Sequence, residues 1–75
     1  MNEKTITLYT YEYYNHSLEM YCTSNFNWTT KAALDEYLGR VYIPVKVVSK
    51  TFSVQDIKSN PNIPFVSDYV REAIR

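Results

Sequence analysis

The strongest constraint on the fold is an alternating run of β-branched and aromatic residues near the start of the chain. The run covers residues 5–14, is broken by Asn15-His16 and resumes over residues 17–23. Period-two alternation on both sides of a polar break is typical of two antiparallel strands joined by a turn. The sequence therefore predicts a β-hairpin, and five of the eight tyrosines of the chain lie within it.

The turn decides which side chains of the hairpin face each other. A two-residue turn at Asn15-His16 pairs Tyr13 with Leu18, Tyr11 with Met20, and Tyr9 with Cys22. This register gathers the bulky side chains on one face, which we expect to be the core face. It also sets Glu12 opposite Glu19, and like charges directly opposite are unfavourable. A one-residue slip or a bulge at Tyr13-Tyr14 is the alternative, and either would turn Ile6 and Leu8 to the other face.

The middle of the chain predicts a helix followed by a strand. Apolar positions at helical spacing indicate a helix over about residues 30–38, capped by Thr29 or Thr30, with Gly39 as the left-handed residue that ends it. Residues 41–48 then alternate as a strand that continues weakly to Phe52. Pro44 has no N–H to donate, so we expect this strand at a sheet edge or a bulge.

The last third predicts a short helical turn and a final helix. Ser53 with Asp56 resembles a helix cap. Asn60-Pro61 ends any helix that begins there after about two turns. Asn62 and Pro64 then suit the start of an amphipathic helix, whose apolar positions recur to Ile74.

The order ββαβα, with a right-handed crossover, predicts an α+β fold. We expect a three-stranded, mainly antiparallel sheet of order 2-1-3 with two helices packed on one face. The residues expected to be buried together are Tyr9, Tyr11, Met20, Leu34, Leu38, Val45, Val47, Val70 and Ile74.

Length and composition limit how such a fold is stabilised. A chain of 75 residues and 8.9 kDa makes one small domain over residues 1–75, with a core barely large enough to hold it. One cysteine and one histidine exclude an internal disulfide and a zinc site. The cysteine count predicts a reducing compartment, and the absence of a secretory or membrane-spanning apolar run predicts a cytoplasmic protein with no membrane contact.

The sequence lacks the residues that catalysis requires. His16 and Cys22 lie at the two ends of one extended strand, roughly 20 Å apart at about 3.3 Å per residue, which is too far for a nucleophile–base pair. Glu12 and Glu19 could approach as glycosidase carboxylates do, but a hairpin surface has no sugar-binding cleft. One glycine cannot build a phosphate-binding loop. We therefore predict a non-enzyme without cofactor or metal.

The tyrosines suggest binding instead. Alternation sends Tyr14, Tyr21 and Tyr42 to the face opposite the expected core, and tyrosine is enriched at the centres of protein interfaces. Scattered surface aromatics without a role are the plainer interpretation. We expect partner binding through Tyr14, Tyr21 and Tyr42 together with Glu12, Glu19 and Lys46. The alternative is a single-stranded nucleic-acid-binding protein that uses exposed Tyr and Lys46 and Lys50, although the pI near 6.5 makes nucleic acid a poor candidate.

Charge is balanced overall but divided along the chain. Residues 1–37 hold five acidic and two basic residues, and residues 38–75 hold three acidic and six basic residues. Such a molecule can form a homodimer or offer an acidic aromatic patch to a larger, basic protein, unless folding mixes the two signs. The profile is that of small inhibitors or adaptors, including phage and mobile-element accessory proteins, that occupy a partner's surface.

Overall fold

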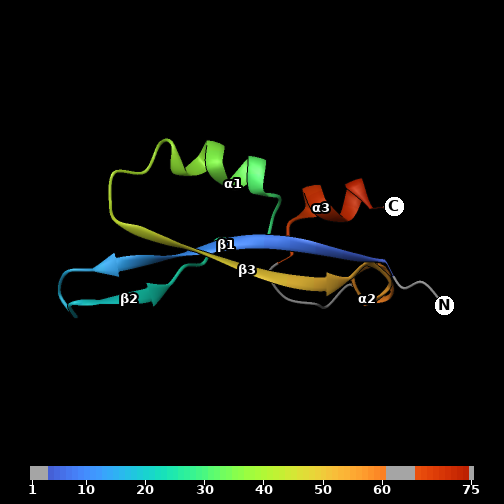
Figure 1. Cartoon of the computed structure of the whole chain (residues 1–75), viewed down its shortest axis with the longest axis horizontal. Coiled ribbons are helices and arrows are strands. Elements are labelled where there is room, and N and C mark those ends of the chain that lie inside the picture. Colours follow the sequence, from blue (N-terminus) through green and yellow to red (C-terminus); the bar gives the residue numbers. More distant parts are fainter. Residues whose placement is uncertain (1–3, 61–65, 75) are drawn as a thin grey trace.

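One long central strand organises the molecule. The computed structural model describes residues 4–60 and 66–74 (Figure 1). The elements are β1 (Thr5–Asn15), β2 (Met20–Thr23), α1 (Lys31–Leu38), β3 (Val45–Ser53), α2 (Val54–Ser59) and α3 (Asp68–Ala73). The three strands form an antiparallel sheet of order β2-β1-β3. The α+β class, the ββαβα order and the sheet order predicted from the sequence are confirmed.

β1 and β3 form a twisted two-stranded ribbon. Their register runs from Thr5 opposite Ser53 to Tyr13 opposite Val45. In Figure 1 the two strands cross in projection, as expected of a ribbon whose strands twist strongly about each other. The same view shows α1 and α3 above this ribbon and α2 at the end of β3.

The predicted hairpin forms, but its register is wrong by four residues. Tyr13 lies opposite Cys22 and Tyr14 lies opposite Tyr21, whereas the sequence pairs Tyr13 with Leu18. The connection is a loop over residues 16–19, because the Asn15 side chain turns the chain by accepting hydrogen bonds from the backbone N–H groups of Ser17 (2.9 Å) and Leu18 (3.1 Å).

This loop also separates the two glutamates that the predicted register set face to face. Glu12 lies opposite Thr23, and Glu19 lies in the loop with a left-handed φ of 52°. A shift of four residues is even, so each side chain keeps the sheet face that alternation predicts for it.

β3 is shorter at its start than the predicted strand. It begins at Val45, directly after Pro44, so Tyr42 and Ile43 lie outside the sheet. The proline nitrogen cannot donate to the ladder, although the Pro44 carbonyl accepts the Tyr14 N–H at 3.0 Å. The prediction that Tyr42 faces outward from a strand is therefore wrong.

α1 begins as predicted and ends differently. Thr30 caps it, because its hydroxyl accepts from the Ala33 N–H at 3.3 Å. Gly39 has a right-handed φ of −61°, not the left-handed conformation expected. The N–H groups of Arg40 and Val41 bond instead to the carbonyls of Tyr37 and Leu38, so the helix end tightens without a left-handed residue.

The two other helices are short and capped by serines. Ser53 caps α2, as predicted, by accepting from the Asp56 N–H at 3.4 Å. Ser67 caps α3 by accepting from the Tyr69 N–H at 3.2 Å. The predicted start of the last helix was too early: Val66 forms a parallel bridge with Trp28, and Asn62 and Pro64 lie outside the described residues.

The main core lies at the N-terminal end of β1. Its buried members are Leu8, Ile57, Val66 and Val70, and packed against them are Ile6, Trp28, Phe52 and Ile74. Trp28 and Phe52 meet edge to face at 5.5 Å. Leu34 of α1 is also fully buried. Aliphatic side chains from the two C-terminal helices thus close over the even-numbered positions of β1.

Several residues expected in the core are not buried. Leu34 and Val70 are buried as predicted, but Met20 and Val47 are exposed, and Tyr9 and Tyr11 are half-buried together with Leu38, Val45 and Ile74. Near Leu8 the core uses the even-numbered face of β1, opposite to the one assigned, so Tyr14 and Tyr21 share the core's face and the prediction that they lie opposite the core is wrong. A leucine can lose all contact with water at no polar cost, whereas a tyrosine must keep a partner for its hydroxyl.

We predict that Leu8→Ala lowers the free energy of unfolding by about 3 kcal/mol, because it leaves a cavity in the centre of this core. Leu18→Ala is the matched control, since Leu18 is 62% exposed in the loop, and should change stability by less than about 0.5 kcal/mol. Denaturant unfolding of both variants measures the difference. Equal midpoints would contradict the assigned core.

Candidate functional site

The outer end of the hairpin gathers aromatic side chains on one sheet face. Tyr14 and Tyr21 lie directly opposite each other on β1 and β2, with ring centroids 5.4 Å apart. The His16 ring stacks on Tyr14 at 5.0 Å. These three side chains, with Leu18 in the loop and with Met20, which is opposite Asn15 and so points to the other sheet face, form what we call the hairpin surface.

The hairpin surface is apolar and open to solvent. Leu18 is 62% exposed, Met20 54% and Tyr21 43%. In Figure 1 the β1–β2 loop is the outermost part of its end of the sheet, and none of the helices reaches it. Large apolar side chains grouped at a protruding turn are more typical of a contact surface than isolated exposed residues are.

Charged residues border this surface. Glu12 lies one pleat behind Tyr14 on the same face and is opposite Lys46 on β3. Glu19 is exposed in the loop, next to Met20. The structure therefore brings together Glu12, Tyr14, Tyr21 and Lys46 of the predicted binding residues. Tyr42 is 97% exposed and lies outside the strands.

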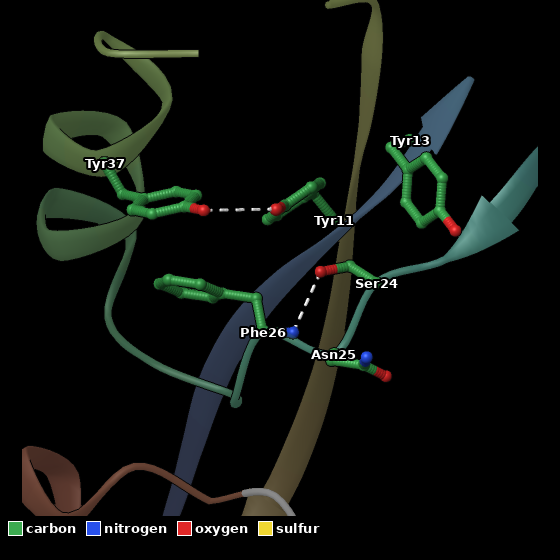
Figure 2. A pocket seen from close by; sticks show the side chains of 6 residues that line it. All are labelled: Tyr11, Tyr13, Ser24, Asn25, Phe26 and Tyr37. Carbon is green, nitrogen blue, oxygen red and sulfur yellow. Dashed lines mark hydrogen bonds between the residues drawn. The ribbon is translucent and has the colours of Figure 1, made fainter. Parts of the chain in front are cut away.

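A second aromatic site was missed by the sequence analysis. A pocket of about 370 Å³, open to solvent, lies between β1, the chain after β2, and α1. Figure 2 shows its lining residues, which are Tyr11, Tyr13, Ser24, Asn25, Phe26 and Tyr37. We call it the aromatic pocket. The signal in the sequence was the presence of Tyr11 and Tyr13 on one face of the first strand, which was expected to be the core face.

Hydrogen bonds of the chain after β2 shape this pocket. Thr29 exchanges two backbone hydrogen bonds with Tyr9, at 2.8 and 3.0 Å, so the chain returns to β1 after a detour over residues 24–28. The detour is held because Thr10 donates its hydroxyl to the Phe26 carbonyl at 2.7 Å and Phe26 donates its N–H to the Ser24 hydroxyl at 2.8 Å. Phe26 is thereby fixed beside Tyr11.

Three rings of the pocket contact one another. The centroid of Phe26 is 4.5 Å from that of Tyr37 and 5.7 Å from that of Tyr11, and Tyr11 and Tyr37 are 5.9 Å apart. The Tyr11 hydroxyl donates to the Tyr37 hydroxyl at 3.5 Å. When Tyr11 is ionised, its oxygen accepts the Tyr37 O–H and its negative charge repels a Tyr37 phenolate, and both effects raise the pKa of Tyr37 above its ordinary value.

The groups that could carry chemistry stay apart. Cys22 is half-buried opposite Tyr13, and His16 stacks on Tyr14. Among residues 4–60 and 66–74, no three His, Cys, Asp or Glu side chains are grouped so as to hold a metal ion. Within that same part of the chain, no helix is both long and apolar enough to cross a membrane.

In comparisons with known proteins, no family model, curated protein or solved structure matches the chain.

We predict that Tyr11→Phe lowers the pKa of Tyr37, because the variant removes both the hydrogen bond and the neighbouring phenolate that raise it. The NMR shift of the Tyr37 Cζ carbon against pH measures this value. Tyr13→Phe is the matched control, because Tyr13 lines the same pocket without contributing to the raised pKa. A Tyr37 pKa that is the same in both variants would contradict the assigned contact.

Proposed function

We propose that this protein is a non-enzymatic protein-binding module, an inhibitor or adaptor, that occupies a larger partner's surface through its hairpin. The observation that carries the proposal is the hairpin surface itself. Tyr14 and Tyr21 are paired across the strands beside a turn that exposes Leu18 and Met20. Tyrosine supplies a large, rigid contact area with few torsions to freeze, which suits it to the centre of an interface.

The charges around the hairpin favour a basic partner. Glu19 is exposed beside the apolar side chains, and Glu12 lies on the same sheet face as Tyr14. Rim carboxylates of this kind speed association with a positively charged surface more than they strengthen the final complex. Action on a host protein by a phage or mobile-element accessory protein in the cytoplasm fits this module and forms part of the proposal.

Single-stranded nucleic acid is less well supported. Binding would require bases to stack on tyrosines and lysines to follow the backbone. Lys46 lies opposite Glu12, and the Lys50 ammonium sits over the Phe52 ring at 5.4 Å, away from Tyr14 and Tyr21. The lysines therefore form no continuous basic track beside the paired tyrosines.

Affinity capture from the native host with the wild-type chain identifies the partner, and Tyr21→Ala tests the contact. We expect this variant to weaken the complex by about 2 kcal/mol, the size of an interfacial hot spot. Tyr69→Ala is the control, because Tyr69 is 63% exposed on α3, away from the hairpin. Calorimetric titration of both variants decides the matter, and equal losses, or none, would contradict the hairpin contact.

Charge reversal at Glu19 separates the two partner classes. Glu19→Lys should slow association with a basic protein and weaken its salt dependence, with less effect on dissociation. The same change should strengthen binding to phosphate if the partner is a nucleic acid. Glu19 is better suited than Glu12, since a lysine at position 12 would face Lys46 across the sheet. Stopped-flow association with the captured protein and titration with an oligonucleotide give the two readouts. Faster protein association in the variant would contradict the acidic rim.

A further inference from the structure

The aromatic pocket has the make-up of a ligand site separate from the hairpin surface. Its volume of about 370 Å³ falls within the range of about 300–1,000 Å³ of small-molecule sites. Four of its six lining residues are aromatic, and Ser24 and Asn25 add polar oxygens at one side. In Figure 2 the rings of Tyr37 and Phe26 lie on one side, Tyr13 lies on the other, and Tyr11 stands between them.

The chemistry of the lining favours a cation. Aromatic faces carry negative partial charge and attract ammonium or guanidinium groups within about 6 Å. None of the six lining side chains is positively charged, so an anion would find no counter-charge among them. The carboxylates of Asp35 and Glu36 pair with Lys31 and Arg40, and Glu12 lies opposite Lys46. The attraction for a cation therefore comes from the aromatic faces and the polar oxygens of the lining itself.

Among cations, a guanidinium fits this lining better than an ammonium. It is planar, it is more weakly hydrated than an ammonium, and it stacks on aromatic rings while donating hydrogen bonds from its edge. The Ser24 hydroxyl, the Asn25 amide oxygen and the tyrosine hydroxyls are acceptors for such donors.

We propose that the aromatic pocket receives an arginine side chain of the partner protein. The inference rests on the proposed function in one respect, that the arginine belongs to a protein. Recognition by the pocket itself depends only on Tyr11, Phe26 and Tyr37 and on the polar side chains beside them.

The test uses the tripeptide acetyl-Gly-Arg-Gly-amide as a probe, followed by NMR of the ¹⁵N-labelled full chain. We expect saturable shifts at residues 11, 26 and 37. The peptide with citrulline in place of arginine has the same shape without the charge, and its affinity should be lower by about tenfold. The lysine peptide should bind more weakly than the arginine peptide at physiological salt. Equal affinity for the arginine and citrulline peptides, equal affinity for the arginine and lysine peptides, or no shifts would overturn the proposal.

Variants locate the binding. Tyr37→Leu should weaken binding of the arginine peptide about tenfold, whereas Tyr37→Phe, which keeps the ring, should bind as the wild type does. Tyr69→Leu is the matched control and should also bind as the wild type does, because Tyr69 lies outside the pocket. Phe26→Leu is a second variant in case Tyr37→Leu does not fold, and it should also lose binding of the arginine peptide. Binding retained by whichever of these two variants folds would overturn the proposal.

The two proposals fail separately. If the arginine peptide binds but Tyr21→Ala binds the partner as strongly as the wild type does, the hairpin contact alone is refuted. A hairpin-dependent complex without binding of the arginine peptide would refute the pocket alone.

Discussion

The pairing of β1 with β3 is the constraint on which the rest of the structure depends. It joins Thr5 to Ser53 and Tyr13 to Val45 across more than thirty intervening residues. Closing such a loop costs conformational entropy, which the ladder and the side chains along it must offset. Since β2 pairs with only the last four residues of β1, the ribbon is the sole long platform in the described residues. The helices, the bridge at Thr29 and the hairpin are all attached to it.

The length of β1 explains why the molecule has two different ends. Its 11 residues extend over about 35 Å at roughly 3.3 Å per residue. The chain has enough aliphatic side chains to enclose one end, around Leu8, where α2 contributes Ile57 and α3 contributes Val70. At the other end Phe26 and Tyr37 pack against Tyr11, and the turn beyond is exposed. Exposure of the hairpin surface is thus a direct result of a small core on a long strand.

Much of the fold was predictable because it depends on local chemistry. The caps at Thr30 and Ser53, the interruption at Pro44 and the order of elements follow from residue types and their spacing. Alternation alone also places Tyr14 and Tyr21 on a shared face, because shifting the register by an even number of residues leaves each side chain on the same face. The turn residues did not reveal the register, because the Asn15 side chain builds a four-residue loop as readily as Asn15-His16 suggests a two-residue turn.

The sequence by itself therefore determined the α+β class, the strand order and the presence of a tyrosine-rich hairpin. Only the tertiary structure decided which face of β1 is buried, because Ile57 and Val70 reach Leu8 from helices more than forty residues away. It alone assembled the aromatic pocket, since Phe26 meets Tyr11 only after the chain detours and returns at Thr29. The physical reason is common to both cases. Alternation specifies where a side chain points, but burial depends on which distant segment arrives to cover it.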